Sequence, residues 1–171
     1  PYATMNESND VRILSASLWF LPVQTRVPLK FGSEVLTSVT CARVCIHVGA
    51  NDGREVAGWG ETPLSVQWVW PSIAPYSERH ETLMDFSARL CTEWMNFDGA
   101  GHALEIGHDF LFGQLPGILK SYNLEHRSGK EPMPWLAALV CASAFDLALH
   151  DAYGVAGDCP TYQAYGSANL N

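Results

Sequence analysis

The sequence has little positive charge. It contains 10 Lys and Arg residues against 18 Asp and Glu residues, which gives a formal net charge of −8. Nucleic acids and anionic membrane surfaces attract clustered cations, so this balance argues against both kinds of partner. The sequence also lacks an uncharged apolar run of about 18 residues and an apolar region near its N-terminus. We therefore expect neither a membrane-spanning helix nor a signal peptide.

The familiar catalytic and metal-binding motifs are missing as well. The sequence has no HExxH, no GxSxG and no glycine-rich phosphate loop. His102 and His108 flank Glu105, but two steps of three residues do not hold all three side chains on one helix face, so we expect surface residues. Three further histidines show no metal-ligand spacing: His47, His80 and His126.

The five cysteines are an odd number and lack metal-ligand spacing. Cys41 and Cys45 share one face of a predicted strand, about 13 Å apart, which is too far for a disulfide. Cys91 and Cys141 lie in apolar helical patterns. These positions predict reduced, buried thiols in a cytoplasmic protein.

The sequence does contain the material for a core. Of its 171 residues 47% are apolar and 16% are charged. That composition is typical of one globular domain and excludes a disordered chain. The first residue is Pro1 rather than a methionine, so we expect the chain to be processed or cut from something longer.

The first half of the sequence predicts strands. Residues 11–18 alternate, residues 34–48 are long and rich in Val, Thr and Ile, and residues 54–62 return after a turn. The turn, residues 49–53 (GANDG), holds Asn, Asp and Gly, which tolerate positive φ. These segments predict a three-stranded antiparallel meander.

Residues 19–32 lie between the first two predicted strands and are long for a hairpin connection. Pro22 and Pro28 are expected to keep this segment out of regular pairing. It also carries Arg26 and Lys30 beside aromatic residues. Because long ordered loops tend to be functional, we expect a functional loop here.

The second half predicts helices. The first runs from Ser77 or Glu78 to Met95, with Ser77 as the N-cap and Glu81 closing a capping box. A second covers residues 102–112, is interrupted at residues 115–117 (LPG), and continues over residues 118–126. Strands followed by helices indicate the α+β class.

A third helix is predicted from Pro132 or Pro134 to about Tyr153, with Gly154 just past its end. Asp146 is its only charged residue between positions 135 and 149. A helix that is apolar on nearly every face must be covered on nearly every face. Since a three-stranded sheet covers one side, we expect another domain or another subunit to cover the rest.

Residues 58–62 (GWGET) form the most informative short segment. Glycines on both sides of a tryptophan allow close backbone packing and a sharp turn, while one ring and one carboxylate stay fixed. For Trp59 we favour packing over substrate contact.

Several segments, taken in order, suggest a family. They are residues 26–32 (RVPLKFG), the Asp52-Gly53 turn, residues 58–62, residues 144–152 (AFDLALHDA), and then Gly154, Gly157, Pro160, Tyr162 and Gly166. Together they resemble the N-terminal capping domain of the enolase superfamily, in its mandelate racemase and muconate lactonizing enzyme branch. The resemblance covers residues 11–166.

This resemblance implies an α+β cap on a modified TIM barrel. In the family, barrel carboxylates bind Mg²⁺, a Lys or His base removes a proton α to a substrate carboxylate, and the metal stabilises the enediolate. Two cap loops close over the substrate, and they correspond here to residues 19–32 and the stretch after Glu61. The reaction is a dehydration, racemisation or cycloisomerisation of an acid sugar or related acid, and the sequence does not fix which.

The chain departs from the family where it ends, at Asn171, because the first barrel strand would begin there. A barrel needs roughly 200 residues or more, so the TIM barrel, every Mg²⁺ ligand and the base should lie outside this chain. We expect an extended or disordered N-terminus (1–10), a capping domain (11–158) and a linker toward the missing barrel (159–171). The isolated chain should be inactive, whereas its parent should be a cytoplasmic, homo-oligomeric enzyme with a small carboxylate substrate.

Three polar residues are candidates for covering the substrate. Arg26 and Lys30 suit an acidic substrate through charge-assisted hydrogen bonds, or they are solvated loop cations. Glu61 is either a substrate-facing carboxylate or an acid that anchors a turn, and we favour a lid residue over a catalyst. The aromatic candidates, for lining the substrate cavity or for packing between domains, are Phe20, Phe31, Trp68 and Trp70.

The third predicted helix supplies the candidates for a domain interface. Asp146 is expected to accept hydrogen bonds at the junction with the barrel, and His150, four residues on, is placed to pair with it. Asp151 falls in the last turn, where a negative charge opposes the helix dipole, so an interface partner would account for it. The alternative to an enzyme domain is a stand-alone binding or oligomerisation module that reuses the cap fold.

Overall fold

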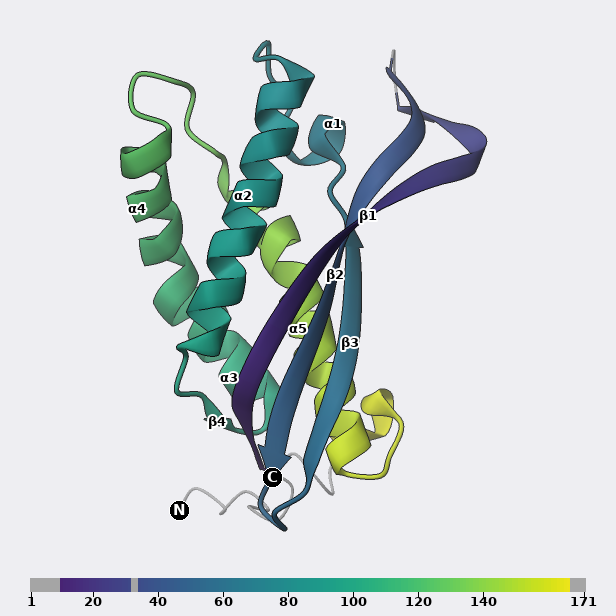
Figure 1. Cartoon of the computed structure of the whole chain (residues 1–171), viewed down its shortest axis with the longest axis vertical. Coiled ribbons are helices and arrows are strands. Elements are labelled where there is room, and N and C mark those ends of the chain that lie inside the picture. Colours follow the sequence, from purple (N-terminus) through teal and green to yellow (C-terminus); the bar gives the residue numbers. More distant parts are fainter. Residues whose placement is uncertain (1–9, 32–33, 167–171) are drawn as a thin grey trace.

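A computed structural model describes residues 10–31 and 34–166. It confirms the α+β class, with three long strands first and the helices after them (Figure 1). The predicted N-terminal segment lies outside the described residues except for Asp10, and so do Gly32 and residues 167–171.

The sheet is built from an antiparallel meander with one added strand. β1 (Val11–Phe31), β2 (Glu34–Ala50) and β3 (Glu55–Pro63) pair in sequence, and β4 (Ala100–Gly101) pairs with the start of β1. The order is β3-β2-β1-β4. The prediction of a three-stranded sheet therefore missed β4, because a strand of two residues leaves no periodic pattern in the sequence.

The segment predicted as a loop, residues 19–32, is not a loop over its described part, because residues 19–31 belong to β1 and form the outer half of its strand in a long β1–β2 hairpin. Pro22 pairs with Thr40 on β2, and proline is tolerated there because β4 on the other side of β1 reaches only Val11 and Arg12. One register shift lies between Ile13 and Ser15, and within this half the register shifts between Gln24 and Leu29, where β1 advances five residues while β2 advances two. Pro28 lies in that irregular stretch. This end of the hairpin projects beyond the helices (Figure 1).

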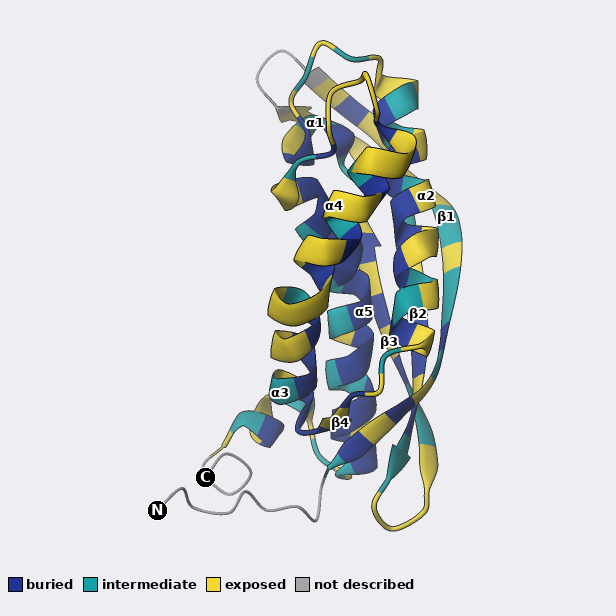
Figure 2. Cartoon of the chain, turned by 90° about the vertical axis from the view of Figure 1, so that its left-hand side faces the viewer, coloured by how far each residue is buried: buried dark blue, intermediate teal, exposed yellow. Residues whose placement is uncertain are grey.

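Side chains alternate between the two faces of the sheet. Val44, Ile46 and Val48 are buried on the face that meets the helices, as the alternation in β2 predicts. Arg43 and His47 are exposed on the opposite face. The helices lie on one side of the sheet and leave the other open (Figure 2).

The described residues form seven helical segments, all after β3 and two of them before β4. α2 (Tyr76–Met95), α4 (Leu115–His126) and α5 (Trp135–Ala156) are the long ones. The short segments are α1 (Val66–Val69), α3 (Ala103–His108), the π-helical η2 (Asp109–Gln114) and the 3₁₀ helix η3 (Thr161–Tyr165).

The predicted start of α2 is wrong in detail. Pro75 is its N-cap and no side chain caps it, while Ser77 lies inside the first turn. The capping box occurs at α3, where the His102 ring accepts from Leu104 N at 3.1 Å and Glu105 accepts from the His102 backbone at 3.2 Å. His102 is 2% exposed, so its prediction as a surface residue is also wrong.

The predicted interruption at residues 115–117 is absent from the described chain, which passes from η2 straight into α4. Pro116 lies in the first turn of α4, where a helix leaves its N–H groups without intrahelical partners, so proline costs little there.

The apolar helix α5 is covered by the domain's own elements. It contacts β2 and β3 of the sheet as well as α2, α3 and α4, and Figure 2 shows it between sheet and helices. The domain itself therefore supplies most of this cover, while Leu136, Leu147 and Val155 of α5 stay exposed. By length and composition α5 is also apolar enough to cross a membrane, but half of its apolar window is buried, and a core helix passes the same test.

Candidate functional site

Gly58 and Gly60 bring β3 into direct contact with α5. A Cβ at Gly58 would lie 2.0 Å from the backbone nitrogen of Ala152, and one at Gly60 would lie 2.2 Å from the carbonyl oxygen of Ala144. No side chain fits at such distances, so both positions require glycine. The close packing predicted for this motif is confirmed.

Trp59 and Glu61 alternate with these glycines and therefore face the open side of the sheet. Trp59 stacks on Trp19, with ring centroids 5.6 Å apart and an angle of 27° between the planes. Glu61 forms an ion pair with Arg43 on the neighbouring strand. A cavity of about 400 Å³ is lined by Arg43, Trp59, Gly60 and Glu61.

A second, larger cavity of about 600 Å³ lies where β3 meets α5, α3 and η3. Asp151 on α5 accepts a hydrogen bond of 2.8 Å from the backbone nitrogen of Trp59. This bond ties the helix to an edge strand and gives Asp151 a partner within the domain. The remaining lining residues are mostly apolar or aromatic and include Leu104, Leu147, Tyr162 and Tyr165.

Asp146 and His150 face this cavity as a pair. His150 Nε2 lies 3.7 Å from Asp146 Oδ1, which is the i,i+4 pairing expected on α5. The other ring nitrogen of His150, Nδ1, shares a hydrogen bond of 2.7 Å with the hydroxyl of Tyr165. Gly107 of α3 packs against this pair, since a Cβ there would lie 2.7 Å from Asp146 Oδ1.

Burial dominates the electrostatics of the pair. It raises the pKa of the Asp146 carboxyl, with His150 acting in the opposite sense. Burial also lowers the pKa of His150, and the charge of Asp146 opposes that change. Burial raises the pKa of Tyr165, so its hydroxyl stays protonated and can donate to His150 Nδ1.

The polar covering candidates Arg26 and Lys30 are exposed at the far end of the β1–β2 hairpin. Phe20, by contrast, is half-buried and packs against the core. Phe31 ends β1, and its side chain lies outside the described residues. The structure thus brings the two cations to one projecting tip, well separated along the hairpin from the cavities beside Trp59.

The two tryptophans after β3 have different surroundings. Trp68 in α1 is 58% exposed and is free to contact a partner. Trp70 is 1% exposed, and its indole nitrogen donates to Glu131 Oε1 at 3.2 Å. Trp70 therefore packs inside this domain, and its assignment to a substrate-covering surface is wrong.

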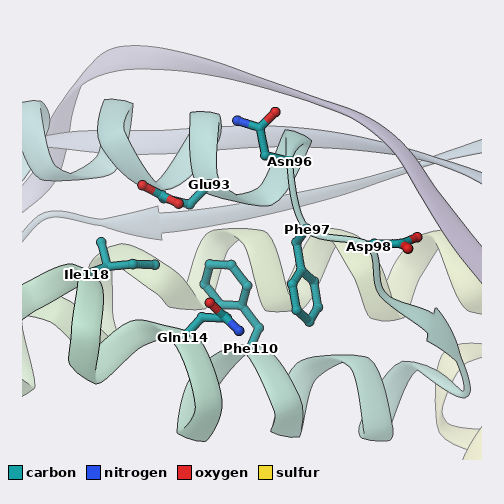
Figure 3. A pocket seen from close by; sticks show the side chains of 7 residues that line it. All are labelled: Glu93, Asn96, Phe97, Asp98, Phe110, Gln114 and Ile118. Atoms are coloured by element: carbon teal, nitrogen blue, oxygen red, sulfur yellow. The ribbon is translucent and has the colours of Figure 1, made fainter.

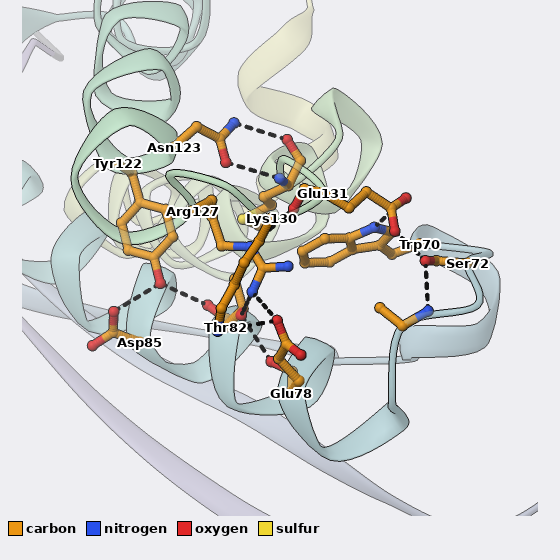
Figure 4. Close-up of polar contacts among 12 residues, drawn as sticks. Trp70, Ser72, Glu78, Thr82, Asp85, Tyr122, Asn123, Arg127, Lys130 and Glu131 are labelled. Atoms are coloured by element: carbon orange, nitrogen blue, oxygen red, sulfur yellow. Dashed lines mark hydrogen bonds and ion pairs between the residues drawn. The ribbon is translucent and has the colours of Figure 1, made fainter.

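Around Trp70 lies a polar network, buried at Arg127 and Tyr122 and exposed at Asp85 and Glu131, which the sequence pattern does not predict (Figure 4). The guanidinium of Arg127 lies 5.2 Å from the centroid of the Trp70 ring and donates to Glu78 at 2.6 Å and to the Glu131 carbonyl at 3.0 Å. Tyr122 donates to Asp85 at 2.7 Å. The network joins α2, α4 and the segment before α5, so its role is to fix these elements.

A third cavity, of about 340 Å³, lies between the end of α2 and α4 (Figure 3). Phe97 and Phe110 form its apolar wall. Its two acids are held by arginines of the domain, Glu93 by Arg89 at 2.6 Å and Asp98 by Arg12. We assign it no role in the candidate site.

The residues present do not fit a magnesium site. Across the described ranges 10–31 and 34–166, no group of three or more His, Cys, Asp or Glu side chains is arranged to hold a metal ion. The five thiols are free, and burial raises the pKa of Cys141 to about 12, so that thiol does not supply a thiolate ligand.

The architecture is a hairpin-built antiparallel sheet with a packed helix layer on one face. This fold agrees with the resemblance to the N-terminal capping domain of the enolase superfamily. The dipeptide epimerase from Enterococcus faecalis, solved with Mg and L-Leu-L-Tyr, matches with a TM-score of 0.51 and 13% identity, over 91% of this chain and 35% of that one. The L-talarate/galactarate dehydratase from Salmonella typhimurium matches with a TM-score of 0.47 and 14% identity, over 97% and 36%.

The chain thus spans about a third of the length of the solved structures it matches. The L-Ala-D/L-Glu epimerase from Bacillus subtilis is a further example, with a TM-score of 0.45 and 15% identity, over 91% of this chain and 34% of that one. No protein-family model matches the sequence, and no curated protein matches it.

Proposed function

We propose that this chain is the capping domain of a Mg²⁺-dependent enzyme of the enolase superfamily, which abstracts a proton α to a carboxylate. The fold supports the proposal, because the chain matches a third of such an enzyme over nine-tenths of its own length. The proposed parent is a cytoplasmic homo-oligomer, and its metal ligands and base lie outside this chain.

In this proposal the cap shapes the substrate cavity. Arg26 and Lys30, exposed on the projecting hairpin, attract and bind a small carboxylate. Glu61 and Trp68 belong to the second covering segment and exclude water from the site. Asp146, His150 and Asp151 lie at the junction with the barrel, where the cavity beside α5 offers exposed apolar side chains.

A direct test is proton exchange. The 171-residue chain is incubated in D₂O with Mg²⁺ and a panel of acid sugars, mandelate and dipeptides, and NMR follows loss of the α-proton signal. We expect no exchange above the buffer rate, with circular dichroism confirming that the chain is folded. Exchange that depends on Mg²⁺ would mean that the chemistry resides in this chain.

The second candidate is a stand-alone binding or oligomerisation module. One observation favours it: Trp59, Leu104, Leu147 and Tyr162 are all exposed around the cavity at the β3–α5 edge. Such a patch can bury itself against a second copy. Light scattering on the wild type and on Leu147→Glu separates the capping domain from the module. A stable oligomer of the wild type that is lost in Leu147→Glu would favour the module.

A further inference from the structure

The open face of the sheet carries a small cavity next to Trp59, which shares Trp59, Gly60 and Glu61 with the larger cavity at the β3–α5 edge and adds Arg43. One face of the Trp59 indole stacks on Trp19, which does not line the cavity, while Trp59 itself does. The indole is 52% exposed, so its apolar surface is held in place and available. A rigid, supported aromatic ring is a low-entropy platform for a flat apolar ligand face.

Arg43 and Glu61 form the polar side of the same cavity. Their side chains are 46% and 44% exposed, and they are paired with each other through Arg43 Nε and Glu61 Oε1. A guanidinium has five N–H donors and a carboxylate about four acceptor positions, so the pair keeps donors and acceptors for a ligand. Donors and acceptors side by side suit adjacent hydroxyl groups, each of which both donates and accepts.

The existing ion pair selects against charged ligands. A carboxylate ligand would compete with Glu61 for Arg43, and an ammonium group would compete with Arg43 for Glu61. A neutral polyol leaves the pair intact. Sugars combine such hydroxyl groups with an apolar C–H face that stacks on indole.

We propose that Arg43, Trp59 and Glu61 form a binding site for a neutral carbohydrate on the open face of the sheet. The cavity of about 400 Å³ has room for one or two sugar rings. Because it is shallow and half-exposed, binding is weak, in the millimolar range. The site is formed by residues of this chain, so its binding can be measured on this chain without a barrel and without Mg²⁺.

The test is an NMR titration of the 171-residue chain with glucose, galactose and cellobiose, which follows the indole N–H signals. We expect saturable shifts of the Trp59 signal with at least one of these sugars. Trp59→Ala should weaken binding at least about tenfold, Trp59→Phe should weaken it less, and Arg43→Gln should weaken it with the fold retained. Trp68→Ala is the matched control, since Trp68 is equally exposed but lies outside the cavity.

Two results overturn the proposal. One is the absence of saturable shifts with every neutral sugar while the spectrum shows a folded chain. The other is equal binding by the wild type and Trp59→Ala. A titration with glucuronate and glycine tests the neutral class, because stronger binding of either would contradict the argument from the ion pair. None of these outcomes bears on proton exchange, so this proposal and the proposed function fail separately.

Discussion

At the scale of single residues, Gly58 and Gly60 set how closely α5 approaches the sheet. Their missing side chains leave room for the helix backbone itself, which cannot move aside as a flexible side chain can. The same spacing turns Trp59 and Glu61 to the opposite face, so one short motif organises both the core and the open surface.

Gly60→Ala is therefore expected to destabilise the domain by roughly 3 kcal/mol, because the new methyl group overlaps the backbone of α5. Gly117→Ala is the matched control: it has open space around it in α4, and alanine there should stabilise by about 0.5 to 1 kcal/mol. Urea unfolding measures both. Equal stability of Gly60→Ala and the wild type would show that β3 and α5 are farther apart than described.

The pair Asp146–His150 predicts a pH dependence of stability. His150 has a lowered pKa in the folded state, so folding favours its neutral form, and that contribution is lost as the pH falls below 6.5. Asp146 acts oppositely, because its raised pKa adds stability at low pH that is lost as the pH rises above 3.8.

Comparison with His150→Gln isolates the histidine. Between pH 7.5 and 5.5, wild-type unfolding free energy should fall more steeply than that of the variant. Urea denaturation at several pH values measures the difference. Parallel curves would mean that His150 titrates normally in the folded domain.

At the scale of elements, the hairpin and the helix layer are held together differently. The inner half of the β1–β2 hairpin has helices against one face, whereas its outer half projects beyond them (Figure 1). A two-stranded ribbon alone is only marginally stable. We expect backbone amides of residues 23–37 to exchange with D₂O at least about tenfold faster than those of residues 42–48. Uniform exchange along the hairpin would contradict this account.

The helix layer depends on Arg127, whose side chain is 3% exposed. Arg127→Met should destabilise the domain by about 2 to 3 kcal/mol, because it leaves Glu78 and the Glu131 carbonyl without their buried donor. Arg89→Met removes an exposed partner of Glu93 and should cost less than about 1 kcal/mol. Thermal unfolding of both variants checks this ranking. A loss of stability for Arg127→Met that is no larger than that for Arg89→Met would mean that the contacts of Arg127 do not stabilise the helix layer.

The sequence predicts those features that arise from neighbouring residues, and it does not predict those that arise from contacts between distant parts of the chain. The glycines of residues 58–62 and the alternation in β2 are local signals, and both predictions held. Pro22 led to the wrong prediction of a loop. Proline breaks regular pairing in general, but it is tolerated here because β1 has no second strand beside it at Pro22. Arg127 could not be foreseen, since its partners lie tens of residues away or in another element.

The site shows the same limit. The spacing of Asp146 and His150 predicts their contact on one helix, whereas Tyr165 joins them only because η3 folds back. Trp68 and Trp70 look alike in sequence, and only the packing shows that one is exposed and the other buried.

At the scale of the whole molecule, the domain has a core of its own. α5 packs between the domain's sheet and its helices, while Leu104, Leu147 and Tyr162 stay exposed at the β3–α5 edge. In the proposed function this edge meets the barrel.

The most direct measurement of the central claim is the nucleotide sequence of the transcript beyond the codon for Asn171. The account predicts that the reading frame continues for roughly 200 residues or more with the alternating strand and helix pattern of a TIM barrel. It should include a Lys-x-Lys pair followed by Asp and Glu residues at successive strand ends. A stop codon directly after Asn171 would contradict the account and leave the stand-alone module.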